Sequence, residues 1–372
     1  MIKTAFSRRS FIRSSAGLSA AAALSPGLAF GATPTFRAPP DNTPHKRTWM
    51  AWPDNGTTIW KDGLLPGMQA NIALIAQTIA MYEPVIMCAN ADSVSAARSL
   101  CGPSVEVIGT IPVDDCWMRD SGPIFRTDGS GHLDIVGLNF NGWGNKQTHA
   151  RDALVASRVA AHLGLRFTAA GLVAEGGAIE TDGRGTLMAT RSSIVNDNRN
   201  PGKTPGQLEA AMCAAYGASK VIWFNGVKDP GDITDDHVDA TSRFLKQGFA
   251  AVQYPPSKDT GIWANDERQQ FQTLAASTDA RGRPIHVTKI HGPEFSLIRQ
   301  RNHPNFVAAY ANYYVCNGGV ICAQFGDTSA DAAAKATLQG LFPGYVVEQI
   351  DIDSIGNGGG GIHCVTQQEP LP

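Results

Sequence analysis

Four side chains able to do chemistry lie in three short motifs of the chain. Asp120 ends a Trp-x-x-Asp segment, His237 and Asp239 form a His-x-Asp motif, and Cys364 follows a glycine-rich run. Two carboxylates can accept the N–H groups of a planar guanidinium from both of its edges. A cysteine thiolate can attack the open central carbon, and a histidine can protonate the leaving group. The set predicts hydrolysis of a guanidinium, with these four as catalytic residues.

Four further residues stand beside these motifs. Trp117 is expected to line the site with its ring, and Gly361 to lie in the loop that carries the nucleophile. Glu175 begins a Glu-Gly-Gly segment and would either orient His237 or contact the substrate. Asn312 would complete a polar wall. We therefore expect substrate-binding roles at Trp117, Glu175, Asn312 and Gly361.

Taken singly, these motifs have simpler explanations. A His-x-Asp pair is often structural, and Asp120 could form an ion pair with Arg119 beside it. The glycine-rich run before Cys364 lacks the lysine of a phosphate-binding loop. His363 is expected to point away from the substrate, because neighbours on a strand face opposite ways. The joint occurrence of the motifs favours one site.

The cysteines argue against a metal centre. None of the seven shows CxxC spacing, so we expect no metal and no other cofactor. Seven is an odd number, so at least one thiol stays unpaired within the monomer. Most of them, including Cys116, are expected to be buried packing residues.

A unit of hairpin, helix and strand repeats along the chain. Each hairpin turns at a glycine that follows Asp, Asn or Gln, and a helical pattern and a short apolar strand come after it. The expected hairpins span residues 122–136, 178–190, 240–253 and 311–324. The expected helices span residues 68–81, 150–163, 205–216, 266–277 and 330–342. The expected strands after them span residues 85–87, 166–168, 220–224, 285–290 and 346–350.

A fifth unit would close a ring by combining residues 361–366 with residues 48–52. Five pseudo-symmetric ββαβ units would then surround a central channel in an α/β propeller. The polar motifs all stand at or just before the first strand of a unit. Equivalent positions in a ring lie at the same end, so the motifs are expected to converge on one pocket.

The motifs and their order resemble the agmatine deiminase and bacterial peptidylarginine deiminase family, part of the guanidino-group-modifying superfamily. The matching segments are DCWMRDSGP (115–123), FNGWG (140–144), EGG (175–177), NRNP (198–201), DHVD (236–239) and GGIHCVTQQ (360–368). The resemblance covers roughly residues 49–370 and implies a five-bladed α/β propeller. It also implies Cys364 as nucleophile, His237 as general acid and base, Asp120 and Asp239 as guanidinium-binding carboxylates, and Trp117 as an aromatic lining residue.

Three functions are compatible with these motifs. The leading one is hydrolysis of agmatine to N-carbamoylputrescine and ammonia through a covalent Cys-amidino (thiouronium) intermediate, a step of putrescine and polyamine metabolism. The second is conversion of peptidyl arginine to citrulline. The third is a non-catalytic guanidinium-binding propeller, which the intact motifs disfavour. An amidinotransferase fits less well, because the matched segments are those of hydrolases. Gly361 stands where agmatine deiminases usually have asparagine. The part of the substrate beyond the guanidinium could therefore differ from that of agmatine.

The first residues predict export. Arg8 and Arg9 precede an apolar stretch over residues 17–24, and small residues follow it. This pattern is typical of a twin-arginine signal peptide, and the stretch is too short to span a bilayer. Residues 1–31 would therefore be removed after contact with the twin-arginine translocation machinery, leaving residues 32–372 as a single periplasmic or secreted domain.

Composition and charge indicate which classes of binding partner to expect. Hydrophobic residues make up 43% and charged residues 17% of the 372 residues, as in a globular protein with a sizeable core. The net charge is -2 and no basic patch stands out, so nucleic acid is not expected as a partner. Loss of four basic residues with the signal would make the mature chain more acidic, which suits a small cationic guanidino substrate. A homodimer is compatible with the sequence, which does not fix the oligomeric state.

Overall fold

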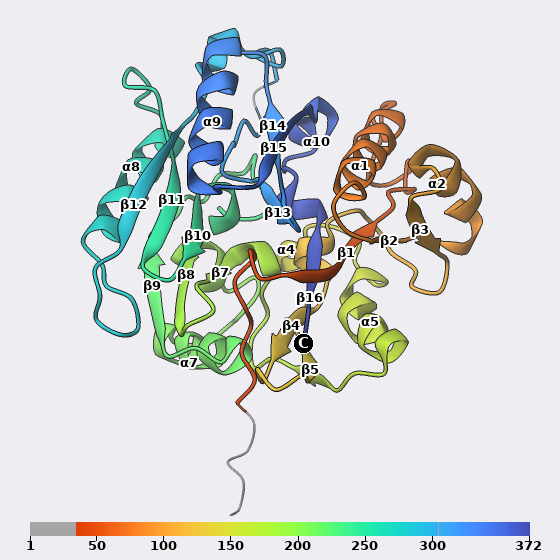
Figure 1. Cartoon of the computed structure of the whole chain (residues 1–372), viewed down its shortest axis with the longest axis horizontal. Helices are drawn as coiled ribbons and strands as arrows, with labels where there is room; N and C mark the ends of the chain where they lie inside the picture. Colours follow the sequence, from red (N-terminus) through yellow and green to blue (C-terminus); the bar gives the residue numbers. More distant parts are fainter. Residues whose placement is uncertain (1–34, 304) are drawn as a thin grey trace, which may run out of the picture. The chain divides into compact units, whose positions relative to one another are not determined.

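Five small β-sheets make up the part of the chain that the computed structural model describes, residues 35–303 and 305–372 (Figure 1). The expected export segment, residues 1–31, lies outside this part. The strands, in the order in which they pair, are β16 (Gln367–Pro370), β1 (His45–Ala51), β2 (Val85–Cys88) and β3 (Val105–Ile108); β4 (Ile124–Thr127), β5 (Leu133–Gly137) and β6 (Phe167–Ala169); β7 (Ile179–Thr181), β8 (Thr186–Thr190) and β9 (Lys220–Phe224); β10 (Ser242–Lys246), β11 (Phe249–Tyr254) and β12 (His286–His291); β13 (Tyr314–Cys316), β14 (Gly319–Gln324) and β15 (Val346–Asp351).

Each sheet is one blade built on the same plan. In four sheets the first two strands form an antiparallel hairpin, and in all five a helix then leads to a strand that pairs in parallel with the second. The principal helices are α1 (Leu65–Ile79), α2 (Val94–Cys101), α5 (Val155–Leu163), α7 (Pro205–Tyr216), α8 (Ile262–Ala275) and α9 (Thr328–Leu341). The predicted five-bladed α/β propeller of ββαβ units is confirmed. The predicted hairpins, helices and strands agree with the structure to within a few residues, except for the strand expected at residues 361–366.

Local sequence explains where the helices begin and end. In α7, the Thr204 hydroxyl accepts a hydrogen bond from the Gln207 backbone while the Gln207 side chain binds back to Thr204. This reciprocal cap satisfies N–H groups that a helix start leaves free. Gly217 then ends α7 in the left-handed region, with φ 67°. Because glycine has no Cβ, it adopts this conformation without a steric penalty.

The first blade departs from the prediction in two ways. It carries an additional helix and strand, α2 and β3, which have no counterpart in the repeated unit and were not expected. It is also closed by the C-terminal strand β16, which pairs antiparallel with β1. The strand expected at residues 361–366 is wrong, because this segment is a loop that ends in a 3-10 turn, η6 (His363–Val365). Its backbone N–H groups at His363 and Cys364 donate to the Asn312 side chain and make no strand ladder.

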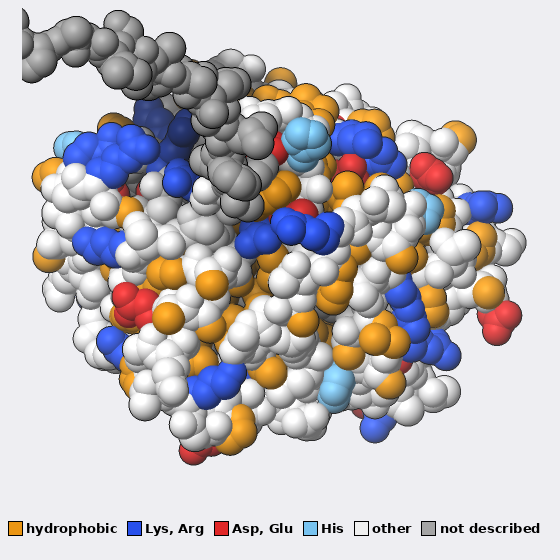
Figure 2. All heavy atoms as spheres, turned by 90° about the horizontal axis from the view of Figure 1, so that it is seen from below, with side chains coloured by type: hydrophobic (Ala, Val, Ile, Leu, Met, Phe, Trp, Pro, Cys, Tyr) orange, Lys and Arg blue, Asp and Glu red, His pale blue; other side chains and the backbone are white. Residues whose placement is uncertain are grey.

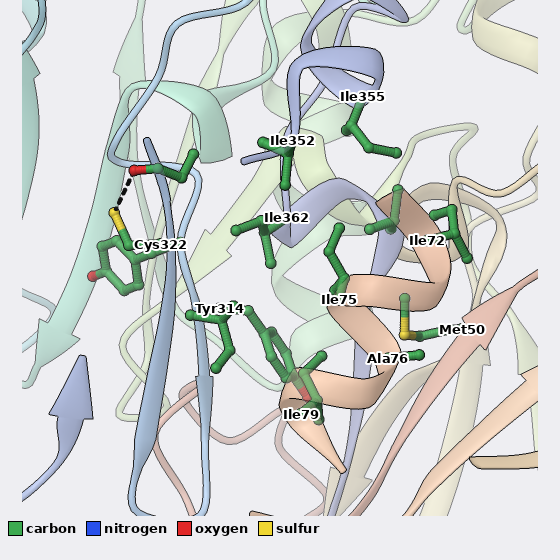
Figure 3. Packing of buried hydrophobic residues seen from close by; sticks show 14 of the residues in the cluster. Met50, Ile72, Ile75, Ala76, Ile79, Tyr314, Cys322, Ile352, Ile355 and Ile362 are labelled. Carbon is green, nitrogen blue, oxygen red and sulfur yellow. Dashed lines mark hydrogen bonds between the residues drawn. The ribbon is translucent and has the colours of Figure 1, made fainter. Parts of the chain in front are cut away.

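The largest apolar cluster joins the first and fifth blades. Figure 3 shows one face of α1, with Ile72, Ile75 and Ile79, packed toward Tyr314 of β13 and Ile362 near η6. These side chains are fully buried or nearly so. Burial of each is worth roughly 1.5–3 kcal/mol, so this cluster holds the C-terminal loop, and the residues after it, against the first blade.

Short helical segments fill several connections, some between blades and some within one blade. They are α3 (Met118–Ser121), α4 (Gly142–Asn145), α6 (Arg191–Ile194), α10 (Asp353–Asn357), η1 (Ala91–Ser93), η2 (Asp152–Leu154), η3 (Gly176–Ala178), η4 (Val238–Ala240) and η5 (Phe295–Leu297). Among the described residues no helix combines the length and the apolar character that a membrane crossing requires. All seven cysteines are free thiols, five of them buried. On the face in Figure 2, basic side chains are spread in small groups among apolar and neutral ones.

Candidate active site

Four helical turns, each just before the first strand of a blade, meet in the interior of the ring. The turn α3 packs against η3 and η6, and η3 packs against η4. Asp120 lies in α3, Asp239 in η4 and Cys364 in η6, while Glu175 and His237 come just before η3 and η4. The structure therefore brings all four predicted catalytic residues together, although on turns and not on the strands themselves.

Cys364 is half-buried beside an amide and a carboxylate. The Asn312 Nδ2 donates to Cys364 Sγ at 3.3 Å, and Asp239 Oδ2 lies 3.7 Å from the same sulfur. Burial and the charges of Asp239 and Asp120 raise the pKa of the Cys364 thiol well above its usual value. Without a ligand the sulfur is therefore a thiol, and a nearby cation is needed to make it a thiolate.

Asp120 and Asp239 are the two carboxylates of the site. Asp120 accepts from Trp143 Nε1 at 2.9 Å and from the Gly177 backbone at 3.1 Å. Asp239 Oδ2 lies 2.7 Å from His363 Nδ1. Its other oxygen, Oδ1, is buried and has no hydrogen-bond partner among the described residues. A buried carboxylate oxygen without a donor costs free energy, so a ligand N–H would be well placed there.

His237 lies between two acids. Its Nε2 is 3.2 Å from Glu175 Oε2, and its Nδ1 is 3.6 Å from Asp120 Oδ1. Burial would lower the pKa of His237, but Asp120, Glu175 and Asp239 outweigh burial and raise the pKa to about 9. The imidazole is therefore protonated at neutral pH and can serve as an acid.

The structure places Glu175 behind His237. Its carboxylate also accepts from Arg199 Nε at 2.8 Å, and the Glu175 side chain is fully buried. Of the two roles expected for Glu175, this geometry fits orientation of His237 and leaves no oxygen turned to a substrate.

Gly177 stands where three functional side chains meet. A Cβ atom built on Gly177 would lie 2.8 Å from Asp120 Oδ1, 2.8 Å from His237 Nδ1 and 3.0 Å from Asp239 Oδ2. No real Cβ tolerates such contacts, so only glycine allows these groups to approach one another. In the Glu-Gly-Gly segment, Glu175 is thus needed for its contact with His237, and Gly177 is needed because it has no side chain.

An aromatic wall borders the nucleophile loop. Trp117 packs on Trp60 with ring centroids 6.1 Å apart, and Gly360 lies so close to Trp117 that any side chain there would collide with the ring. Gly361 lies against Asn312 in the same way. Gly361 therefore makes room for the amide that contacts Cys364, and its backbone hydrogen bond lowers the pKa of the thiol.

Sequence reasoning missed three supporting side chains. Trp143 lies in the FNGWG segment, but its hydrogen bond to Asp120 is not among the predicted contacts. Arg199 holds Glu175, and Asp41 lies 2.7 Å from His363 Nε2. The expectation that His363 points away as a strand neighbour is wrong in its reason, because η6 is a turn, and the ring is hydrogen-bonded to Asp239.

The backbone of α4 is unusual where it carries Trp143 to Asp120. Gly142, Trp143, Gly144 and Asn145 all have positive φ, at 66°, 55°, 84° and 63°. A tryptophan in this left-handed conformation is strained, and such strain is often found at functional sites. A Gly-Trp-Gly-Asn sequence is the available signal, since glycine and asparagine tolerate left-handed backbone.

Within the described residues, one group of acids and histidine converges closely enough to suggest a metal site. It consists of Asp41, Glu180 and His363. Arg243 donates to both carboxylates, at 2.6 Å to Asp41 and 2.7 Å to Glu180. His363 uses its second nitrogen on Asp239. The group is therefore an internal ion-pair network in which the Arg243 guanidinium already supplies the positive charge between the two acids.

Comparisons with known proteins match almost the whole described chain. The profile of the Porphyromonas-type peptidyl-arginine deiminase family matches residues 37–370. A protein of Streptomyces coelicolor is 39% identical over 346 residues, covering 90% of this chain and 99% of the relative. The agmatine deiminase of Pseudomonas aeruginosa is 33% identical over 359 residues, covering 91% and 96%. The solved structure of agmatine deiminase of Enterococcus faecalis has a TM-score of 0.84 at 28% identity, covering 92% and 98%.

Proposed function

The chain belongs to the Porphyromonas-type peptidyl-arginine deiminase family and is a hydrolase of guanidino C–N bonds, and we propose that its substrate is agmatine. The products would be N-carbamoylputrescine and ammonia. The observation that carries a guanidinium substrate is the buried Oδ1 of Asp239, which has no hydrogen-bond partner among the described residues and lies in the same site as Cys364 and Asp120. The names of the agmatine deiminases among its relatives support the choice of substrate.

Charge favours a guanidinium in this position. Asp120 and Asp239 would accept its N–H groups from two edges, in the bidentate manner that carboxylates and guanidinium share. Arg199, the neighbouring arginine, is already engaged by Glu175 and Asp235 and does not neutralise these two carboxylates. The ring of Trp117 offers an apolar surface for a methylene tail.

The bound cation would also activate the nucleophile. Asp120 and Asp239 raise the pKa of Cys364 in the free protein, so a guanidinium held between them offsets their charge and lowers that pKa. The thiol proton passes to solvent, and the thiolate Sγ of Cys364 attacks the guanidinium carbon, which becomes tetrahedral. The C–N bond then breaks as protonated His237 gives its proton to the departing ammonia, which leaves a thiouronium on the enzyme.

Water completes the reaction. Neutral His237, oriented by Glu175, accepts a proton from water as the oxygen attacks the thiouronium carbon. The C–S bond breaks, the proton of the added hydroxyl passes to Cys364 Sγ, and the carbamoyl product leaves a free thiol for the next turnover. The scheme uses one water for each ammonia and needs no other reactant.

Peptidyl arginine is the second candidate substrate, because the matching family takes its description from that activity. Free arginine, agmatine and an arginine-containing peptide share the reacting group and differ only in the tail. Discrimination therefore depends on the loops around the mouth of the site, including the segment that holds Trp60.

The test measures ammonia release from agmatine, free arginine and an arginine peptide, with Cys364→Ser as the inactive control. We expect agmatine to give the highest kcat/KM and a haloacetamidine to label Cys364 alone. Preference for the peptide would make peptidyl arginine the substrate. Binding of all three without any ammonia would leave the non-catalytic guanidinium-binding protein as the correct account.

A further inference from the structure

His363 joins two carboxylates that lie far apart in sequence. Its Nδ1 is 2.7 Å from Asp239 Oδ2, and its Nε2 is 2.7 Å from Asp41 Oδ2. The His363 side chain is 2% exposed. The chain of contacts thus runs from the floor of the catalytic site to the segment that precedes β1.

Asp41 is held firmly from its own side. Arg243 donates to Asp41 Oδ2 at 2.6 Å, and Gln368 of β16 donates to Asp41 Oδ1 at 2.6 Å. Arg243 is also paired with Glu180 and donates to the Tyr313 carbonyl at 2.7 Å. Asp41 is therefore a fixed point and not a mobile side chain of the terminal segment.

Geometry limits where the protons lie. Each ring nitrogen of His363 lies 2.7 Å from a carboxylate oxygen, so each contact requires a proton between nitrogen and oxygen. A neutral ring carries only one such proton. The three groups together therefore hold one proton more than a neutral ring and two ionised carboxylates would. Burial and the charges of Arg119 and Arg243 lower the pKa of His363, while hydrogen bonds to Asp239 and Asp41 oppose this shift. Wherever that proton resides, it offsets the negative charge on the Oδ2 side of Asp239.

We infer that Asp41, acting through His363, is a positioning residue for the guanidinium-binding carboxylate of Asp239. His363 occupies Oδ2, so the carboxylate is fixed in a plane that leaves Oδ1 free for the substrate. It also reduces the negative charge beside the Cys364 sulfur, 3.7 Å from Oδ2. This inference rests on the proposed function, since it assumes that Asp239 binds the guanidinium.

The role follows from contact and not from sequence pattern. Asp41 and His363 are 322 positions apart, and Asp41 belongs to no motif of the sequence. The segment that carries Asp41 is bound to the ring through β16, the same strand that closes it. The site is therefore complete only when the N-terminal segment is docked.

The experiment compares Asp41→Asn with wild type and with Asp134→Asn in the full mature enzyme. Asp134 is a buried aspartate paired with Arg126 and Arg166, away from the site, so it repeats the chemical change elsewhere. Asp41→Asn should fold, because Arg243 keeps Glu180. Two readouts are measured: kcat and KM for agmatine, and the rate of Cys364 alkylation by iodoacetamide between pH 6 and 10.

We expect Asp41→Asn to lower kcat/KM by about tenfold or more, the size typical of lost partners that orient functional histidines. The alkylation profile should move to higher pH by at least about half a unit. In the variant less of the negative charge of Asp239 is offset, and that charge raises the pKa of the neighbouring Cys364 thiol. Asp134→Asn should lower only the melting temperature. A kcat/KM within twofold of wild type, together with an unshifted alkylation profile, would overturn the inference. A wild-type enzyme that turns over no guanidino compound would instead refute the proposed function, while the alkylation profile would still decide the role of Asp41.

Discussion

Asp120 and Asp239 carry the same side chain in the same site, yet their surroundings make them different acids. Burial and the neighbouring carboxylates raise the pKa of Asp120 to about 6, against the opposing effects of His237 and Trp143. Burial also acts on Asp239, but His363, with help from His237 and Arg243, outweighs it and lowers the pKa. One acid therefore titrates near physiological pH, and the other stays ionised.

This difference predicts a pH-dependent affinity that a Cys364→Ser variant can report without turnover. Below pH 6 Asp120 takes up a proton and loses the charge that binds the guanidinium. Agmatine binding must then displace that proton, so its affinity should fall by about tenfold for each unit below pH 6. Asp239 stays ionised and His237, with a pKa of about 9, stays protonated over the same range.

Isothermal titration calorimetry between pH 5 and 8 checks this prediction. A second variant that adds Asp120→Asn should bind weakly and show almost no pH dependence between pH 5 and 7. Constant affinity over that range with Asp120 intact would show that this carboxylate does not titrate as argued.

At the scale of single residues, the sequence identifies the two carboxylates, the histidine and the cysteine of the site because each stands in a short motif. It does not identify their partners. The bond from Trp143 to Asp120 crosses 23 positions, and that from Arg199 to Glu175 crosses 24. Each pair joins the turn before a blade's first strand to a segment that follows its second strand, so it forms only when that blade folds, and no local pattern predicts it.

At the scale of elements, the turns ahead of the first strands do the positioning. Each is one turn long, so it fixes a side chain at the inner end of a blade without extending into the site. The repeated unit could be predicted because turn residues, helical periodicity and apolar strands are local signals. The strand predicted at residues 361–366 was wrong because its backbone bonds go to the Asn312 side chain, a contact from another blade.

The turn η3 offers a direct test through Gly177. Gly177→Ala places a methyl group against Asp120, His237 and Asp239 at once, so these groups must move apart. Displacement of catalytic groups by about 1 Å can cost about 100-fold in rate. We expect kcat/KM to fall by that order while the melting temperature changes little.

Gly206→Ala in α7 is the matched control. A Cβ there meets no heavy atom within 4 Å, and alanine favours a helix by up to about 1 kcal/mol over glycine. This variant should keep full activity and melt slightly higher. Equal activity of the two variants would contradict the steric role given to Gly177.

At the scale of the whole molecule, the two ends of the described chain share one sheet. Glu369 of β16 accepts from Trp49 Nε1 of β1 at 2.9 Å, and both side chains are buried. The residues just before β16 include Cys364, so ring closure and the nucleophile depend on the same few residues.

Removing the acceptor at Glu369 should therefore weaken closure. Glu369→Ala leaves the Trp49 N–H buried without a partner, which costs about 1–3 kcal/mol. We expect a melting temperature several degrees lower, measured by differential scanning fluorimetry, and earlier loss of activity on heating. Glu369→Gln keeps an acceptor oxygen and should lose clearly less. Equal melting of Glu369→Ala and wild type would mean that this contact does not stabilise the closing sheet.

The last prediction concerns where the molecule works. Arg8 and Arg9 lie outside the described residues, so the export proposal rests on sequence, on an arginine pair followed by a short apolar stretch. The twin-arginine route carries folded proteins, which suits an enzyme with seven free thiols, because folding before export keeps most of them buried.

Changing both Arg8 and Arg9 to lysine should keep the protein in the cytoplasm at full length. Arg13→Lys, which leaves the pair intact, should be exported like wild type. Cell fractionation with mass analysis should find wild type in the periplasm, shortened by about the first 31 residues. Wild-type protein retained inside at full length would refute export and place the deiminase in the cytoplasm.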